Sequence, residues 1–151
     1  MLITRQARSD DLDQLLVLYR HLNPNIPQLS EQRRREIWRE TLANENLSLM
    51  VGVVADRPIA TCLLITAPNL MRGGAPHAFL ENVVTHPDVR RCGYGRATVR
   101  AALDDAWRRG CFQVFLMTGR GRANPFVLTF YESCGFEQGG KTGFVAPRPV
   151  G

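Results

Sequence analysis

The stretch from Glu81 to Arg96, ENVVTHPDVRRCGYGR, decides how this sequence is interpreted. It follows and overlaps an apolar, β-branched run, Leu80–Thr85, which is typical of a buried strand. Pro87 ends the strand, because proline has no N–H to donate to a neighbouring strand. Gly93 and Gly95 then let the backbone turn sharply before a long helical pattern. The helix N-terminus brings unpaired N–H groups and a partial positive charge to this turn, so an anion can bind there.

Three arginines, Arg90, Arg91 and Arg96, add fixed positive charge around the same turn, and we interpret it as a cradle for a pyrophosphate. It is not a P-loop, because that motif needs lysine and then serine or threonine after its last glycine, and Arg96 and alanine follow here. It is not the dinucleotide fingerprint, because Thr98 stands where a third glycine or alanine is needed. A basic turn that only connects strand and helix is the alternative.

The pattern Arg90-x-x-Gly93-x-Gly95 resembles the acetyl-CoA signature of the GNAT superfamily of N-acetyltransferases. The resemblance implies acetyl-CoA as acetyl donor and an α/β (α+β) fold, a central mixed β-sheet flanked by helices. It also implies that backbone groups of one strand bind the pantetheine amides and hold the thioester oxygen as it becomes an oxyanion. The implied cofactor-binding residues are Val83, Val84 and Thr85 on the strand, and Arg90, Arg91, Cys92, Gly93, Tyr94, Gly95 and Arg96 at the pyrophosphate.

A second resemblance to GNAT proteins lies in Asn124 and the run Phe130–Phe136, FYESCGF. It implies that Asn124 contacts the pantetheine arm. It further implies that Tyr131 binds the cofactor near the thioester sulfur and protonates the departing thiolate. A phenol with a reference pKa near 10 is protonated at neutral pH and can donate that proton. An amphipathic core tyrosine is the alternative.

Glu81 is the candidate general base, because an acid in this register serves as base in some GNAT members. A carboxylate, often through water, can accept the proton that an amine must lose before it attacks a thioester. Strand alternation puts Glu81, Val83 and Thr85 on one face unless a bulge, common in the family here, intervenes. The alternative is a strand-end glutamate that belongs to a hydrogen-bond network.

The rest of the chain predicts a sheet with helices between its strands. A strand–helix–strand unit joins 79–85 and 111–117 and favours parallel pairing of these two strands. Its helix has Val99, Leu103, Ala106 and Trp107 on one side. No linker or repeat divides the chain, so we expect a single domain over 1–151. The expected strands are 3–8, 47–55, 59–66, 79–85, 111–117, 136–138 and 144–146, with a turn at 56–58, and the expected helices are 12–22, 31–41 capped by Ser30, 95–109 and 125–134.

Composition and charge indicate which kinds of partner and site the protein should have. The net charge is +5, with one lysine, but the arginines are spread along the chain without interleaved aromatic residues, so we expect no nucleic-acid partner. No apolar run approaches the roughly 20 residues that span a bilayer, and the N-terminus lacks a signal-peptide core, so we expect a cytoplasmic protein without a membrane partner. The cysteines have no metal-binding spacing, so we expect neither a metal site nor disulfides, with Cys62 and Cys111 as small core residues.

The sequence therefore predicts an N-acetyltransferase that moves an acetyl group from acetyl-CoA to a primary amine of a small molecule. Direct transfer in a ternary complex is favoured, because neither Cys92 nor Cys134 has a base at recognisable spacing. The run Glu81–Val84 resembles the strand of amino-sugar-phosphate acetyltransferases, although Asn82 departs from their acidic pair. An amino sugar or another amino metabolite is the expected acceptor. Protein N-termini or lysines, a non-catalytic CoA sensor or assembly protein, and a homodimer remain alternatives.

Overall fold

A computed structural model describes residues 1–119 and 125–148. Contacts within the chain divide it into two compact units, Met1–Leu116 and Met117–Gly151. The first unit carries the sheet and the helices α1, α2 and α3, and the second carries α4 (Pro125–Cys134). The prediction of a single domain over 1–151 stays a prediction.

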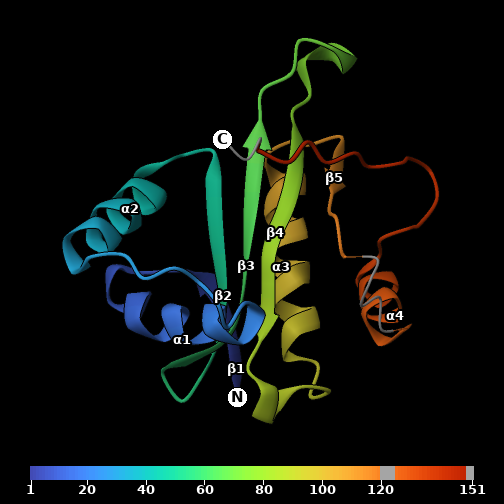
Figure 1. The fold of residues 1–151 in the computed structure, drawn as a ribbon. Helices are drawn as coiled ribbons and strands as arrows, with labels where there is room; N and C mark the ends of the chain where they lie inside the picture. Colours follow the sequence, from blue (N-terminus) through green and yellow to red (C-terminus); the bar gives the residue numbers. More distant parts are fainter. Residues whose placement is uncertain (120–124, 149–151) are drawn as a thin grey trace. The chain divides into compact units, whose positions relative to one another are not determined.

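The strands of the first unit form one mixed sheet in the order β1-β2-β3-β4-β5 (Figure 1). The pairs β1–β2, β2–β3 and β3–β4 are antiparallel, whereas β4 and β5 are parallel, as the strand–helix–strand unit predicted. This mixed sheet flanked by helices confirms the predicted fold class. The strands are β1 (Leu2–Gln6), β2 (Leu47–Val54), β3 (Arg57–Ala67), β4 (His77–Thr85) and β5 (Gln113–Phe115).

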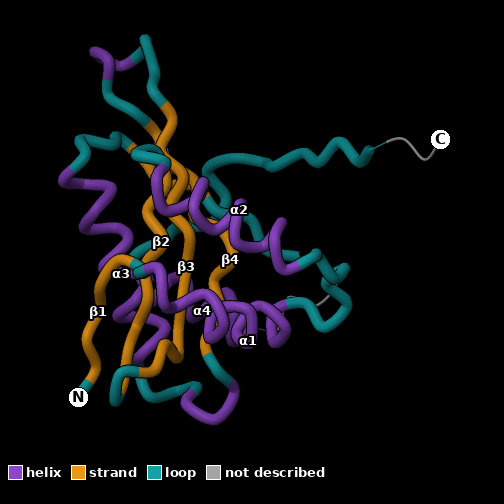
Figure 2. Tube along the Cα trace, turned by 90° about the vertical axis from the view of Figure 1, so that its left-hand side faces the viewer, coloured by secondary structure: helices purple, strands orange, loops and turns teal. Residues whose placement is uncertain are grey.

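Helices cover both faces of the sheet. Figure 2 shows α1 (Leu12–Leu22) and α2 (Glu31–Ala43) on one side of the sheet and α3 (Tyr94–Arg108) on the other. The predicted cap of α2 is confirmed, because the Ser30 hydroxyl accepts a hydrogen bond from the Arg33 N–H at 3.2 Å. Short 3-10 turns lie at 9–11, 72–74 and 87–89.

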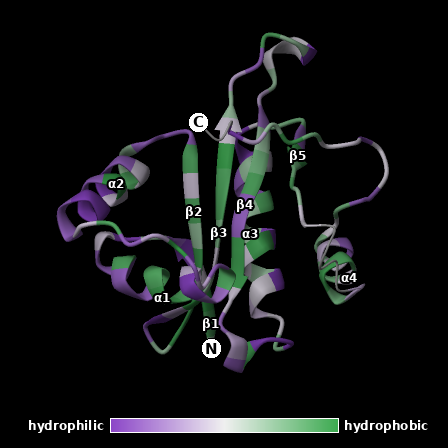
Figure 3. Ribbon diagram, in the orientation of Figure 1, coloured by the Kyte–Doolittle hydropathy of each residue, from purple (hydrophilic) through white to green (hydrophobic). Residues whose placement is uncertain are grey.

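The core consists of two layers, one on each face of the sheet, and Figure 3 shows hydrophobic residues along much of β2, β3 and β4. On the α1 and α2 side, Leu15 and Trp38 pack against Leu49, Val51 and Val53 of β2. On the α3 side, the Cys62 thiol lies 3.7 Å from the Thr98 carbonyl oxygen. The apolar stripe of α3 is buried as predicted, except that Trp107 is 51% exposed. The buried part of that stripe is Val99, Ala102, Leu103 and Ala106.

Gly52 lets α3 lie close to the sheet. A Cβ atom at this position would collide with the Thr98 hydroxyl, which itself donates to the Tyr94 carbonyl at 2.9 Å. Because Thr98 stands in the first turns of α3, Gly52 helps to set how the N-terminus of α3 approaches β2. The sequence alone does not single out this glycine, because nothing in a single sequence shows which helix residue crosses it.

The structure differs from the prediction at several places, among them β1, which is Leu2–Gln6 rather than 3–8. The final strands at 136–138 and 144–146 are wrong, because residues 136–148 contain no strand. Their apolar runs are short, glycines interrupt them, and Phe144 is 89% exposed, so pairing would bury little apolar surface. The hairpin turn is Ala55–Asp56 rather than 56–58, because both residues have positive φ, as in a type I′ turn. The strand predicted at 111–117 is limited to β5, Gln113–Phe115.

The described residues contain no helix that is both long enough and apolar enough to cross a membrane. Cys62 and Cys111 are buried, as predicted for core residues. Cys134 is also buried, whereas Cys92 is exposed. Burial raises the pKa of the Cys111 thiol, so this thiol stays protonated at neutral pH.

A buried ion pair joins β1 to the start of α1. The Arg5 guanidinium donates two hydrogen bonds to the Asp11 carboxylate, at 2.6 and 3.0 Å, and the Arg8 N–H donates a third at 2.7 Å. Asp11 is only 4% exposed. Burial by itself would raise the pKa of Asp11, but the hydrogen bonds from Arg5 and Arg8 outweigh it, and the pKa lies below the usual value.

We predict that Asp11→Asn lowers the free energy of unfolding by about 3 kcal/mol at pH 7, because it leaves the Arg5 charge without a partner. This is the lower end for a buried pair, since the Arg5 side chain keeps 20% exposure. A carboxyl with a depressed folded pKa stabilises the fold above its unfolded pKa, near 3.9, and this stability is lost as the pH falls through the folded pKa. Urea unfolding at pH 7 and pH 3 should therefore show the difference between wild type and variant shrinking in acid. An equal difference at both pH values would contradict this role of Asp11.

Candidate active site

The turn that follows β4 is folded back onto the end of that strand. The Arg90 side chain donates from Nε to the Thr85 carbonyl at 3.2 Å, and the His86 N–H donates to the Ile59 carbonyl at 2.8 Å. The His86 ring also lies edge-to-face on His21, with 4.8 Å between ring centroids. Because His21 is in the last turn of α1, this contact ties α1 to the start of the turn.

Gly93 places the N-terminus of α3 at the open side of this turn. It is the N-cap residue of α3 and has a φ of +82°, in the left-handed region that favours glycine. No side chain in the described part of the chain caps this helix, and a Cβ atom on Gly93 would meet nothing within 4 Å. The space beside the N-cap residue is therefore open, and the first N–H groups of α3 have no partner within the helix. Arg90, Arg91 and Arg96 are all exposed around it.

A bulge in β4 changes which residues share a face of the sheet. Glu81 pairs with Leu63 and Val84 pairs with Thr61, so the single residue Cys62 of β3 lies opposite two residues of β4. The first of these two, Asn82, has a φ of +52°. The alternation that would group Glu81 with Val83 and Thr85 does not hold, because the bulge intervenes. Glu81 and Val84 share a face instead.

Beyond Phe79, the edge of β4 toward β5 has no partner strand in the described residues. The parallel pairing of β4 and β5 covers His77–Phe79 and ends at the pair Phe79 and Phe115. Backbone groups from Leu80 to Val84 therefore lie on an open edge, which an extended molecule can join in the manner of an added strand. Val83, Val84 and the turn at Gly93 are thus brought to one part of the first unit by consecutive segments of the chain.

Glu81 is half-buried on the face of the sheet that α1 covers. Its neighbour Leu63 packs against the core cluster of that face, as Tyr19 of α1 also does. Burial raises the pKa of Tyr19 to about 12, so its phenol keeps its proton throughout the neutral range.

Tyr131 lies in the second unit, on α4. Its ring is edge-to-face with Phe130 at 5.1 Å and with Phe136 at 5.9 Å between centroids. Gly135, with a φ of +102°, ends the helix as predicted, and the Phe136 N–H donates to the Tyr131 carbonyl at 3.1 Å. The other predicted residue of this region, Asn124, is outside the described residues.

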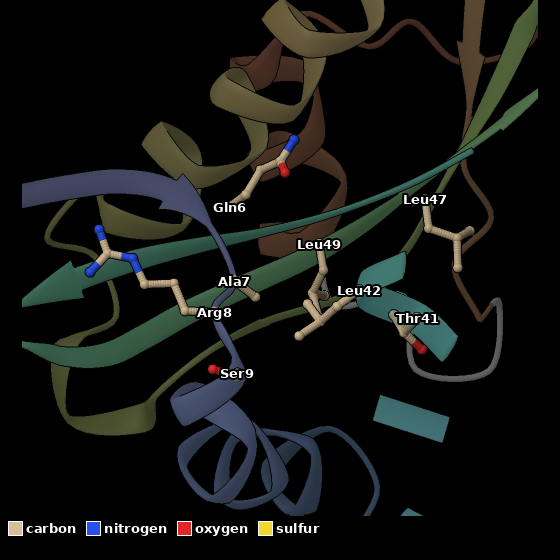
Figure 4. A pocket seen from close by; sticks show the side chains of 8 residues that line it. All are labelled: Gln6, Ala7, Arg8, Ser9, Thr41, Leu42, Leu47 and Leu49. Carbon is tan, nitrogen blue, oxygen red and sulfur yellow. The ribbon is translucent and has the colours of Figure 1, made fainter. Parts of the chain in front are cut away.

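A pocket separate from the cradle opens at the other end of the sheet (Figure 4). The end of β1, the end of α2 and the start of β2 bound it, with Gln6, Thr41 and Leu47 among its lining residues. None of the predicted site residues lines this pocket. Within the described ranges, no group of three or more histidine, cysteine or acidic side chains is placed to hold a metal ion.

The chain is similar to known acetyltransferases in sequence. The model of the acetyltransferase (GNAT) family matches residues 12–136. A glucosamine 6-phosphate N-acetyltransferase of Trypanosoma brucei brucei is 26% identical over 140 residues, which cover 87% of this chain and 86% of that protein.

Two solved structures extend the comparison to the fold. A proposed acetyltransferase of Agrobacterium tumefaciens str. C58 is 43% identical, with a TM-score of 0.90 over 97% of this chain and 99% of the other. An aminoglycoside N-acetyltransferase in complex with CoA has a TM-score of 0.80 at 19% identity, over 99% of this chain and 96% of the other, and shows the shared fold alone.

Proposed function

The chain belongs to the acetyltransferase (GNAT) family, and from this premise we propose that it transfers an acetyl group from acetyl-CoA to the primary amine of a small molecule. The family membership makes the chain an acetyltransferase and implies acetyl-CoA as donor. The observation that carries the proposal is the uncapped N-terminus of α3 at Gly93, bordered by exposed arginines.

The residues of the cradle fit the donor. A pyrophosphate needs N–H donors, positive charge and room for close approach, and the Gly93 turn supplies all three. The nearby edge of β4 offers the backbone of Val83 and Val84 to the amides of a pantetheine arm. Besides its positive charge, Arg90 contributes a hydrogen bond to the Thr85 carbonyl, and this bond holds the turn in place.

In the proposed reaction, the free amine nitrogen of the acceptor attacks the thioester carbon. Glu81 takes the proton that the nitrogen loses, directly or through one water. A backbone N–H of the open β4 edge stabilises the negative charge on the carbonyl oxygen. The carbon–sulfur bond then breaks, and Tyr131 donates its phenolic proton to the departing sulfur. The products are the acetylated amine and CoA.

The acceptor is proposed to be small because the relative with the broad match in sequence is named for glucosamine 6-phosphate. Amino sugars and other amino metabolites are therefore favoured over protein N-termini and lysines. A non-catalytic CoA sensor is disfavoured, because the chain keeps both Glu81 and Tyr131 and belongs to a family of acetyltransferases.

Acetyl-CoA or CoA should raise the melting temperature, because a ligand that binds only the folded state stabilises it by mass action. At a hundredfold excess over Kd, the expected rise is roughly 5–10 °C for a chain of this size. Dephospho-CoA should give almost the same rise if the pyrophosphate cradle dominates binding. Differential scanning fluorimetry with each nucleotide in turn measures these shifts.

NAD and ATP are the controls for this measurement. Each carries linked phosphates and an adenine but no pantetheine arm for the open edge of β4, so each should give a smaller rise than CoA. A larger rise with NAD than with CoA would overturn the assignment of the donor.

A further inference from the structure

Four aromatic rings gather where β4 and β5 begin, and no part of the proposed reaction uses them. The His77 ring is edge-to-face with Phe79 at 5.6 Å, with Phe112 at 6.2 Å and with Phe115 at 6.2 Å between centroids. Phe79 and Phe115 also lie 5.4 Å apart, with their planes tilted by 35°. We call these four residues the aromatic cluster. All of them belong to the first unit.

The aromatic cluster ends at the point where β4 and β5 separate. Phe79 and Phe115 are the last residues that pair in the parallel ladder. Glu81 follows Phe79 by two residues, before the bulge, so the two side chains lie on the same face of β4. The ring of Phe79 is therefore the next side chain along that face from the proposed base, about 7 Å away along the strand.

The face of β4 that carries Phe79 and Glu81 is only half covered within the first unit. On the α3 side, Leu64, Ala78 and Leu80 are fully or almost fully buried. On the opposite side, the residues that alternate with them are half-buried, and Phe79 is 37% exposed. A phenylalanine that stays this exposed inside a four-ring cluster presents a flat apolar surface to a ligand.

Charge also favours an amine on this surface. The face of an aromatic ring carries partial negative charge, and Glu81 adds a carboxylate beside it. The guanidinium of Arg72 lies 4.7 Å from the centroid of Phe112, at the end of the aromatic cluster away from Glu81. A cationic amine is thus attracted to the Phe79 end, while Arg72 covers the other.

We propose that Phe79 and Phe115 form the floor on which the acceptor lies. The acceptor is then a primary amine carried by a ring with an apolar face, and the ring rests on the two phenylalanines while its nitrogen reaches Glu81. This assignment rests on the proposed acetyl transfer and adds the residues that choose the substrate. An aromatic amine and an amino sugar both offer such a ring face.

The test compares Phe79→Ala with the matched control Trp107→Ala in a thiol-release assay. Trp107 is also an exposed aromatic residue, but it lies on α3 at the other side of the sheet. The acceptors are phenethylamine, glucosamine, glucosamine 6-phosphate and the linear diamine cadaverine. Phe79→Ala should raise the KM of the ring-bearing acceptors about tenfold and the KM of cadaverine less than twofold. Phe79→Tyr keeps the flat ring and should restore the KM.

The results of this assay distinguish the acceptor class, the role of the aromatic cluster and the proposed function. The acceptor with the lowest KM in the wild type shows whether the ring comes from an aromatic amine or from an amino sugar. If Phe79→Ala lowers the melting temperature but leaves every KM at the wild-type value, the aromatic cluster only packs the sheet and the inference is wrong, while the proposed function stands. If the wild type binds acetyl-CoA but acetylates no amine, the proposed function fails, and the inference fails with it.

Discussion

A Gly93→Val variant should fold and lose measurable binding of CoA. Gly93 has a φ of +82°, and a β-branched residue in this region is strained by about 1–2 kcal/mol. The added side chain would also occupy the open space over the N-terminus of α3, where the pyrophosphate is proposed to lie. We expect Kd for CoA to rise by at least roughly a hundredfold, equivalent to two missing phosphate contacts. Isothermal titration with CoA measures the loss.

Gly110→Val is the matched control for this variant. Gly110 follows α3, has a φ of +74°, and a Cβ atom there also meets nothing within 4 Å. It carries the same backbone strain but lies beyond the other end of the helix from the cradle. Gly110→Val should therefore lose comparable stability and keep its affinity for CoA. A folded Gly93→Val variant with wild-type affinity would show that Gly93 is not part of the cradle.

A Tyr131→Phe variant should lose turnover by roughly 10²–10⁴, the usual range for general acid–base catalysis. The substitution removes one hydroxyl and keeps the ring between Phe130 and Phe136, so packing should barely change. The KM for acetyl-CoA should move little, because the ring, which is proposed to lie near the thioester sulfur, is kept. Intact turnover with weakened cofactor binding would make Tyr131 a binding residue. No change in either constant would return it to a structural role.

The pH profile of the same variant separates the phenol from other groups. If Tyr131 donates the proton, the descending limb of turnover at high pH should disappear in Tyr131→Phe. Tyr19→Phe is the control, because the pKa of Tyr19 is about 12 and its phenol does not titrate in the range that the assay covers. A limb that persists in Tyr131→Phe would assign it to another group.

The elements of the sheet could be predicted where an apolar run and the residues that end it indicate the same boundaries. β4 is a β-branched run between a polar loop and Pro87, and α3 has an apolar stripe that ends at Gly110. The final strands could not be predicted, because three-residue apolar runs beside glycines have no period long enough to separate a strand from a loop. The hairpin turn was misplaced because Ala55, unlike glycine or asparagine, gives no local signal of a positive φ.

The turn at Gly93 could be predicted, because its parts follow one another in the chain from Thr85 to Gly95. The aromatic cluster could not, because His77, Phe79, Phe112 and Phe115 come from two strands whose register the sequence does not state. The face of β4 on which Val84 joins Glu81 could not be predicted either, because it depends on the bulge at Asn82. The bulge at Asn82 appears in the pairing of β3 and β4, and a single strand with regular alternation would not reveal it.

The most direct test of the proposed function is release of the CoA thiol from acetyl-CoA in the presence of an amine, with the mass of the product measured in the same reaction. The panel should include amino sugars, their phosphates, aromatic amines, linear diamines and a lysine peptide. We predict thiol release that depends on a small amine and a product that is heavier by one acetyl group. Acetyl-CoA that is bound but not consumed with any amine, or transfer to the lysine peptide alone, would contradict it.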